Sequence, residues 1–314
     1  MLKYGRIEAK MKKIRIDVKN FSLNKTLKSE QCVADLFFFD SIQNHWITYM
    51  PVNNVWAKII LKQDNNNTLT IRYFPDEIDE KEVIHKINYV FSLDEDYKNF
   101  VEKFGKDKYL MKIYNVSNGI RIMMDINKEY RIIESLLTQN TSVRMIKVMQ
   151  RNLLVNYGEH IMVGDEIIFS YPDLKRIAND KVDSIREKIK CGYRAKYIKN
   201  IAEAIIFGKL DINKISDLDT ISARKYLMEF SGIGPKVADL ILMYAFSKKD
   251  VFPTDIWARR TIGNIYFEGR EPLPKELTNF VNEYFGKFAS LINLMIFYFE
   301  RRDKNKLFNL LVWR

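Results

Sequence analysis

Cysteine is scarce in this chain. Only Cys32 and Cys191 occur among 314 residues. Structural zinc sites and iron–sulfur clusters draw most of their ligands from sets of cysteines, and a disulfide scaffold needs several pairs. We therefore expect neither a metal cluster nor a disulfide framework, and we expect Cys191, which lies in a polar helical context, to be an ordinary thiol.

Long apolar runs are also missing. No stretch approaches the roughly 20 apolar residues that a membrane-spanning helix requires, and the N-terminus lacks the hydrophobic segment of a secretory signal. These absences predict an intracellular protein, in the cytoplasm or nucleoid if the source is prokaryotic, with no membrane contact. Residues 1–10 read as an extension ahead of an alternative start at Met11.

Basic and apolar residues, by contrast, are abundant. The net charge is +11, and 47% of the residues are hydrophobic. That content can build real cores, and the length suggests two or three domains. The positive charge favours a polyanionic partner such as nucleic acid, although a merely basic, soluble surface would give the same excess.

The order of local patterns predicts an α+β fold. Short runs rich in β-branched and aromatic residues predict strands of an antiparallel sheet; they lie at 12–18, 46–50, 55–63 and 68–74. Helical spacing follows, and from about residue 126 nearly every segment reads as helix. We expect an N-terminal antiparallel β-sheet domain with flanking helices over 1–122, and an all-helical body over 123–314 with a helix-hairpin-helix motif at 221–246.

Two glycines in the run SGIGPKVAD predict the hairpin of that motif. A helix capped by Ser222 must stop at Gly232, and Gly234 is a second permissive backbone position. Pro235 suits the first turn of the next helix. Backbone N–H groups at such a turn favour a DNA phosphate. A similar turn also joins helices with no ligand, and many helix-hairpin-helix proteins only bind DNA.

Lys236 and Asp255 are the candidate catalytic pair. Lys236 is the second residue of the new helix, where the positive end of the helix dipole favours a neutral amine over an ammonium ion. A neutral lysine is a nucleophile that forms Schiff bases. The extended Phe252-Pro253 backbone makes Asp255, or Thr254, the N-cap of a later helix. A capping carboxylate can also stabilise an oxocarbenium-like sugar. The plainer alternatives are phosphate contact for the lysine and capping alone for the aspartate.

The segments SGIGPKVADLIL and VFPTDIWARR resemble the helix-hairpin-helix DNA glycosylase superfamily, most of all its 8-oxoguanine DNA glycosylase/AP lyase branch. Residues 119–142 and 171–205 resemble the start of the helical domain and the strand-reading segment of that branch. The resemblance covers roughly residues 30–300. It implies a bifunctional enzyme of base excision repair, which extrudes an oxidised purine, 8-oxoguanine, from duplex DNA and nicks the strand by β-elimination.

The resemblance also assigns roles to individual residues. Lys236 matches the Schiff-base lysine, and Asp255 matches the catalytic aspartate. The implied DNA contacts are Asn140 in the gap left by the flipped base, Tyr193 as a wedge, Arg194 as reader of the orphan cytosine, and the hairpin residues Gly232, Gly234 and Val237. The implied base pocket consists of Ser41, Leu240, Asn293 and Phe297. Without the resemblance, Tyr193 would read as core packing and Asn140 as an Asx turn.

Several pocket positions depart from the pattern of the branch. Leu240 stands where a cysteine is usual, Ser41 where a glycine is usual, and Asn293 where a glutamine is usual; Met145 replaces an arginine near the orphan cytosine. These departures affect the choice of lesion and opposite base more than the lyase chemistry.

The resemblance implies a monomer that binds double-stranded DNA containing a damaged base. No metal or organic cofactor is expected in the chemistry, and a monovalent cation at the hairpin carbonyls is implied by the resemblance alone. The rival interpretations are an alkylated-purine glycosylase, which generally lacks a lysine like Lys236, and a non-enzymatic DNA-binding protein. An enzyme acting on oxidised pyrimidines is less favoured, because the four-cysteine cluster of many such enzymes is missing.

Overall fold

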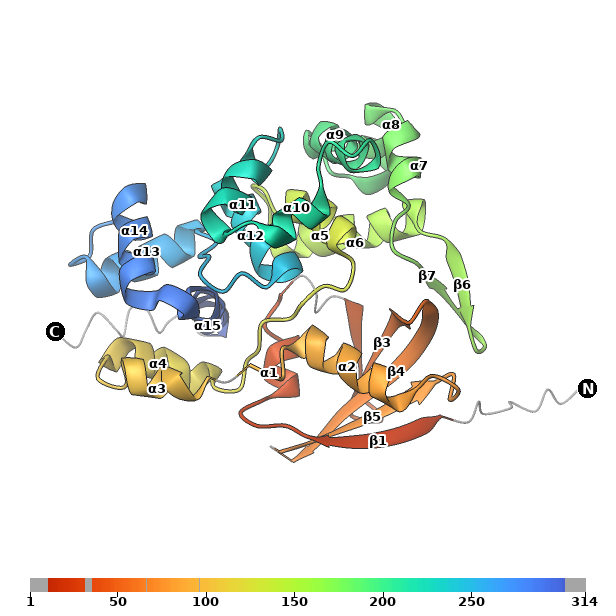
Figure 1. Cartoon of the computed structure of the whole chain (residues 1–314), viewed down its shortest axis with the longest axis horizontal. Helices are drawn as coiled ribbons and strands as arrows, with labels where there is room; N and C mark the ends of the chain where they lie inside the picture. Colours follow the sequence, from red (N-terminus) through yellow and green to blue (C-terminus); the bar gives the residue numbers. More distant parts are fainter. Residues whose placement is uncertain (1–10, 32–35, 66, 96, 303–314) are drawn as a thin grey trace, which may run out of the picture.

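The computed structural model describes residues 11–302 except 32–35, 66 and 96 (Figure 1). The predictions about residues 1–10 and about Cys32 lie outside the described residues. Among the helices described, none is both long and apolar enough to span a membrane. No group of three or more His, Cys, Asp or Glu side chains within the described ranges forms a candidate metal site.

The N-terminal region is a five-stranded antiparallel sheet with the order β1-β5-β4-β3-β2. Its strands are β1 (Lys12–Asp17), β2 (Phe37–Asp40), β3 (His45–Val52), β4 (Val55–Asn65) and β5 (Thr68–Phe74). Asn53 and Asn54 both have positive φ, as a two-residue hairpin turn requires. The predicted strands are confirmed, whereas β2 was missed because only four residues pair there.

Alternate side chains of the central strands point to the same face of the sheet and form the core beneath it. Ile59 and Leu61 on β4 and Ile71 on β5 are fully buried, as the two-residue period of a half-buried strand dictates. Helix α2 (Glu80–Phe91) covers this face, and its Phe91 ring lies 5.6 Å from that of Phe37 on β2. The short helix α1 (Leu23–Leu27) lies alongside and leads into the segment that carries Glu30.

The remainder is a helical body, as predicted. Its helices are α5 (Lys128–Leu137), α6 (Val143–Tyr157), α7 (Leu174–Asn179), α8 (Val182–Ile189), α9 (Arg194–Ile206), α10 (Ile212–Asp217), α11 (Thr220–Met228), α12 (Pro235–Phe246), α13 (Ile256–Tyr266), α14 (Pro274–Phe280) and α15 (Ala289–Arg302). Helices α3 (Lys98–Phe104) and α4 (Lys108–Ser117) belong to the earlier part of the chain but lie beside α15 (Figure 1).

The helical body also contains one hairpin that the all-helical prediction missed. Strands β6 (His160–Val163) and β7 (Glu166–Phe169) have only four residues each, too few for a clear alternation. The hairpin extends toward the N-terminal sheet (Figure 1). There Glu166 accepts hydrogen bonds from Lys58 at 2.6 Å and from the Tyr49 hydroxyl at 2.8 Å, which joins the two regions.

One local prediction was wrong. Asp219, not Ser222, caps α11: its carboxylate accepts from the N–H groups of Ile221 at 2.9 Å and Ser222 at 3.0 Å. Cys191, predicted to be an ordinary thiol, is fully buried between α8 and α9. Burial raises the pKa of its thiol to about 11, which leaves it protonated at neutral pH and unreactive.

Candidate active site

The predicted hairpin joins α11 to α12. Gly232 has φ +97°, a conformation that strongly favours glycine, and a Cβ at this position would lie only 2.5 Å from Cγ of Tyr197. Gly234 caps α12 and Pro235 occupies its first turn, as predicted. The N–H groups of the first helical turn have no partner within the helix, and this end of α12 can bind a phosphate.

Val237 can take part in the predicted DNA contact only through its backbone. Its side chain is 4% exposed and packs in the core, so only its backbone N–H can face DNA. Lys236, the second residue of α12, is half-buried at the start of the helix. The structure thus places the candidate nucleophile at the positive end of α12, as its sequence position predicted.

Asp239 connects the start of α12 to the segment before Asp255. It lies one turn after Lys236, is 7% exposed, and accepts a 2.5 Å hydrogen bond from Nε of Arg224 on α11. Its carboxylate also accepts from the backbone N–H of Phe252, and burial raises its pKa against the opposing effect of Arg224. This carboxylate therefore links the backbone of Phe252, three residues before Asp255, to α12.

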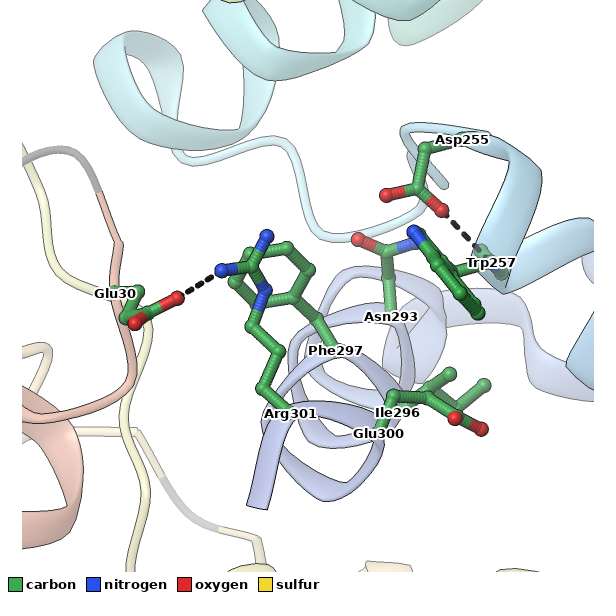
Figure 2. A pocket seen from close by; sticks show the side chains of 9 residues that line it. Glu30, Asp255, Trp257, Asn293, Ile296, Phe297, Glu300 and Arg301 are labelled. Carbon is green, nitrogen blue, oxygen red and sulfur yellow. Dashed lines mark hydrogen bonds and ion pairs between the residues drawn. The ribbon is translucent and has the colours of Figure 1, made fainter. Parts of the chain in front are cut away.

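Asp255 is the N-cap of α13, and Thr254 is not. One Asp255 oxygen accepts a 2.7 Å hydrogen bond from the N–H of Ala258, while the other points away from the helix toward the cavity (Figure 2). The preceding Pro253 carbonyl accepts from Nδ2 of Asn293 at 3.1 Å. The carboxylate is held in place by one oxygen and open to a ligand through the other.

A pocket of about 740 Å³ lies between the start of α13 and one face of α15. Asp255 and Trp257 line it from α13, and Asn293 and Phe297 line it from α15 (Figure 2). Glu300 also lines it and accepts a 2.7 Å hydrogen bond from the Thr261 hydroxyl. An aromatic ring, an amide and a carboxylate around one cavity can hold a planar base next to a sugar.

Ser41 and Leu240 do not line this pocket. Ser41 lies in the exposed turn between β2 and β3, because the strand pairing places residues 41–44 at the tip of a hairpin. Leu240 packs, partly buried, against the core on α12. The structure thus does not bring these two residues to the cavity beside Asp255, and their assignment to the base pocket stays a prediction.

Glu30 is a pocket residue that the sequence analysis missed. It has φ +60° and lines the cavity from the N-terminal region, where it pairs with Arg301 at the end of α15 (Figure 2). Neither periodicity nor composition marks this position. Only the folded chain brings Glu30 to α15.

The predicted DNA-reading residues lie close to the hairpin. Asn140 has φ +39° and is exposed in the turn between α5 and α6, and Tyr193 is 49% exposed at the start of α9. Nε2 of Gln139 donates to the Gly232 carbonyl at 3.2 Å. An exposed tyrosine, an exposed asparagine and the glycine turn thus share one side of the helical body.

Arg194 is not free to read a base in this structure. Its guanidinium donates to the carbonyls of Gln139, Cys191 at 3.1 Å and Asn140 at 3.2 Å. The side chain is 7% exposed and stacks on Tyr193 with 4.7 Å between its guanidinium carbon and the ring centroid. In this structure Arg194 ties the Asn140 turn to the Tyr193 turn, and its role as reader of the orphan cytosine stays a prediction.

Comparison with known proteins agrees with this geometry. The HhH-GPD superfamily of base excision DNA repair proteins matches residues 133–287, and the N-terminal domain of 8-oxoguanine DNA glycosylase matches residues 13–147. A probable N-glycosylase/DNA lyase of Methanothermobacter thermautotrophicus is 28% identical, over 92% of this chain and 96% of its own length.

Two further proteins extend the comparison. An endonuclease III of Sulfolobus acidocaldarius is 31% identical over 52% of this chain and 67% of its own length. The structure described as MBOgg1 in complex with a low-affinity DNA ligand superimposes with a TM-score of 0.82 and 26% identity, and the match covers 93% of this chain and 96% of that one. The chain belongs to the helix-hairpin-helix (HhH-GPD) superfamily of base excision DNA repair proteins, in the form that carries the N-terminal domain of 8-oxoguanine DNA glycosylases.

Proposed function

We propose that this protein is a bifunctional DNA glycosylase and AP lyase that removes 8-oxoguanine from double-stranded DNA in base excision repair. The observation that carries the proposal is the pocket in which the open oxygen of Asp255 and the ring of Phe297 face one cavity, together with Lys236 as the second residue of α12. The matching family, named for 8-oxoguanine, supports the choice of lesion. No second function is favoured by a specific feature of the pocket.

Binding begins at the phosphate backbone. The start of α12 contacts a phosphate, and Tyr193 enters the duplex while Asn140 fills the space left by the extruded nucleotide. The extruded base then stacks on Phe297. The partner is duplex DNA with a damaged base, bound by one copy of the chain.

The chemistry uses Lys236 and Asp255. The amine nitrogen of Lys236 attacks C1′ with its lone pair, the bond from C1′ to the base breaks, and the base leaves with the bonding electrons and takes up the proton that the amine loses. Asp255 stabilises the positive charge that develops on the sugar. The sugar ring opens to a Schiff base with Lys236. Loss of a C2′ proton then expels the 3′ phosphate and nicks the strand.

This sequence of steps needs no metal or organic cofactor, because lysine itself is the nucleophile. A monovalent cation at the hairpin carbonyls remains a proposal, and it would act on DNA binding only. An alkylated-purine glycosylase that uses water would have no need of Lys236. A protein that only binds DNA would have no need of the pocket.

Borohydride trapping tests the proposal. The wild-type protein, a duplex with one 8-oxoguanine and borohydride are expected to give a covalent protein–DNA adduct, and Lys236→Gln is expected to give none. Lys225→Gln is the matched control, since Lys225 is an exposed lysine on α11. If Lys236→Gln still formed the adduct or still nicked the strand, the assignment of the nucleophile would be wrong. Duplexes with an alkylated adenine, assayed in parallel, decide between lesion classes.

A further inference from the structure

One face of α15 ends in a guanidinium that covers the pocket. Asn293, Phe297 and Arg301 follow one another at four-residue spacing, which places them on the same side of the helix. The guanidinium carbon of Arg301 lies 4.4 Å from the centroid of the Phe297 ring. The same guanidinium pairs with the Glu30 carboxylate across the cavity (Figure 2).

The segment that carries Glu30 is firmly anchored. The next residue, Gln31, is 1% exposed and donates to the Arg121 carbonyl at 2.9 Å. Its own side-chain oxygen accepts from the N–H of Met123 at 2.9 Å. Glu30 itself has φ +60°, which is unfavourable for a residue with a Cβ. Such backbone persists only where its surroundings hold it, and it is concentrated at ligand sites.

The guanidinium of Arg301 shares three properties with an extruded base. It is planar, it stacks on aromatic rings, and it carries several N–H donors in one plane. A guanine-type base is also planar and also presents several N–H donors. Because both need the Phe297 face, they cannot occupy it together.

Charge favours a donor-rich occupant once Arg301 leaves. Among the described residues that line the pocket, Arg301 is the only basic one, and the lining also includes the carboxylates of Glu30, Asp255 and Glu300. Asn293 donates its amide N–H to Pro253, so its carbonyl oxygen is left as an acceptor. The vacated pocket offers acceptors to N–H groups on more than one edge of a base, which a guanine-type base has and an adenine-type base largely lacks.

We propose that Arg301 occupies the Phe297 face as a placeholder in the DNA-free enzyme, and that Glu30 exchanges the guanidinium for N–H donors of a guanine-type base during extrusion. Arg301 then opposes base entry, whereas Glu30 selects the base. The inference rests on the proposed function and names two specificity-determining residues for it.

The test compares two activities in single-turnover reactions. Release of the base from an 8-oxoguanine duplex needs the pocket to accept a base, whereas nicking of a duplex with a preformed abasic site does not. In Arg301→Ala, the ratio of base release to abasic-site nicking is expected to rise about fivefold, because one cation–π contact and one exposed ion pair no longer compete with the base. Arg186→Ala is the control, since Arg186 forms an exposed ion pair with Asp183 on α8.

The double variant Arg301→Ala/Glu30→Gln separates the two roles. If Glu30 accepts hydrogen bonds from the base, the ratio of base release to abasic-site nicking in the double variant is expected to fall about tenfold below the ratio in Arg301→Ala. A loss of about tenfold is typical of a hydrogen bond to a charged acceptor. An unchanged or lower ratio in Arg301→Ala would overturn the placeholder, and equal ratios in the single and double variants would overturn the role of Glu30. A wild-type protein that neither releases the base nor nicks the abasic site would instead refute the proposed function, and this inference with it.

Discussion

Nε of Arg224 on α11 donates a 2.5 Å hydrogen bond to the carboxylate of Asp239 on α12, so one ion pair joins the two helices of the hairpin. The same carboxylate accepts from the N–H of Phe252, three residues before Asp255. The pair therefore couples the helix that carries the candidate nucleophile to the segment that carries the candidate carboxylate. Asp239 is a positioning residue, because it holds α11, α12 and the segment before Asp255 together and does not itself contact substrate.

Replacement of Asp239 by Ala is expected to lower the free energy of unfolding by about 2–3 kcal/mol, because Arg224 and the Phe252 N–H both lose a buried partner. Abasic-site nicking is expected to fall as well, because the segment before Asp255 is no longer fixed. Urea denaturation and single-turnover nicking measure the two effects. Asp183→Ala removes an exposed ion pair and should change stability by no more than about 0.5 kcal/mol. Equal effects of the two variants would contradict the role of Asp239.

Replacement of Asp255 separates capping from catalysis. Asn caps a helix about as well as Asp, so Asp255→Asn is expected to keep the wild-type unfolding temperature. It carries no charge to stabilise the sugar cation, so base release is expected to fall at least about 100-fold. Asp255→Ala should lose the same activity and, in addition, about 1 kcal/mol of stability. Near-normal base release by Asp255→Asn would show that Asp255 only caps α13.

Two glycines of the hairpin make a matched pair. Gly232 has φ +97°, and a methyl group on it would collide with the Tyr197 ring. A methyl group on Gly234 would meet no atom within 4 Å. Gly232→Ala is therefore expected to lose more than about 1 kcal/mol and to weaken DNA binding. Gly234→Ala should stay within about 0.5 kcal/mol of the wild type. Thermal unfolding measures the stability of each variant, and a DNA titration at fixed salt measures its affinity. Similar stabilities of Gly232→Ala and Gly234→Ala would contradict the close packing at Gly232.

The Glu300 carboxyl gives a pH-dependent prediction. Burial and the charge of Asp255 raise its pKa, and the Thr261 hydrogen bond opposes the shift. Between an unfolded pKa of about 4.3 and the raised folded pKa, the folded state binds more protons than the unfolded state. Wild-type stability should therefore rise as the pH falls through this window.

Glu300→Gln keeps the acceptor for Thr261 but carries no charge. We expect it to be more stable than the wild type near about pH 7.5, and we expect this advantage to shrink as the pH approaches about 4.5. Unfolding temperatures of both proteins across this range measure the difference. A constant difference at every pH would show that Glu300 has the same pKa in the folded and unfolded states.

The local features of this protein could be predicted from the sequence. Strand alternation in β3–β5, the glycine turn before Pro235 and the cap at Asp255 depend on residues within a few positions of each other, where backbone sterics and capping rules decide the conformation. The resemblance to a known superfamily rested on these same local segments. The assignments that it implied were least specific at Ser41 and Leu240, where the residues depart from the pattern of the branch.

The pocket was decided by tertiary structure. Glu30 and Arg301 are 271 positions apart, and no local rule brings a glutamate with φ +60° to the last turn of α15. The side chain of Arg194 is likewise positioned by the carbonyls of Gln139 and Asn140, which lie more than 50 positions away in the chain. The amino-acid sequence by itself determined the hairpin, its lysine and the capping aspartate, because short-range sterics act there; only long-range packing decided which side chains close the cavity around them, because those contacts form after the helices have docked.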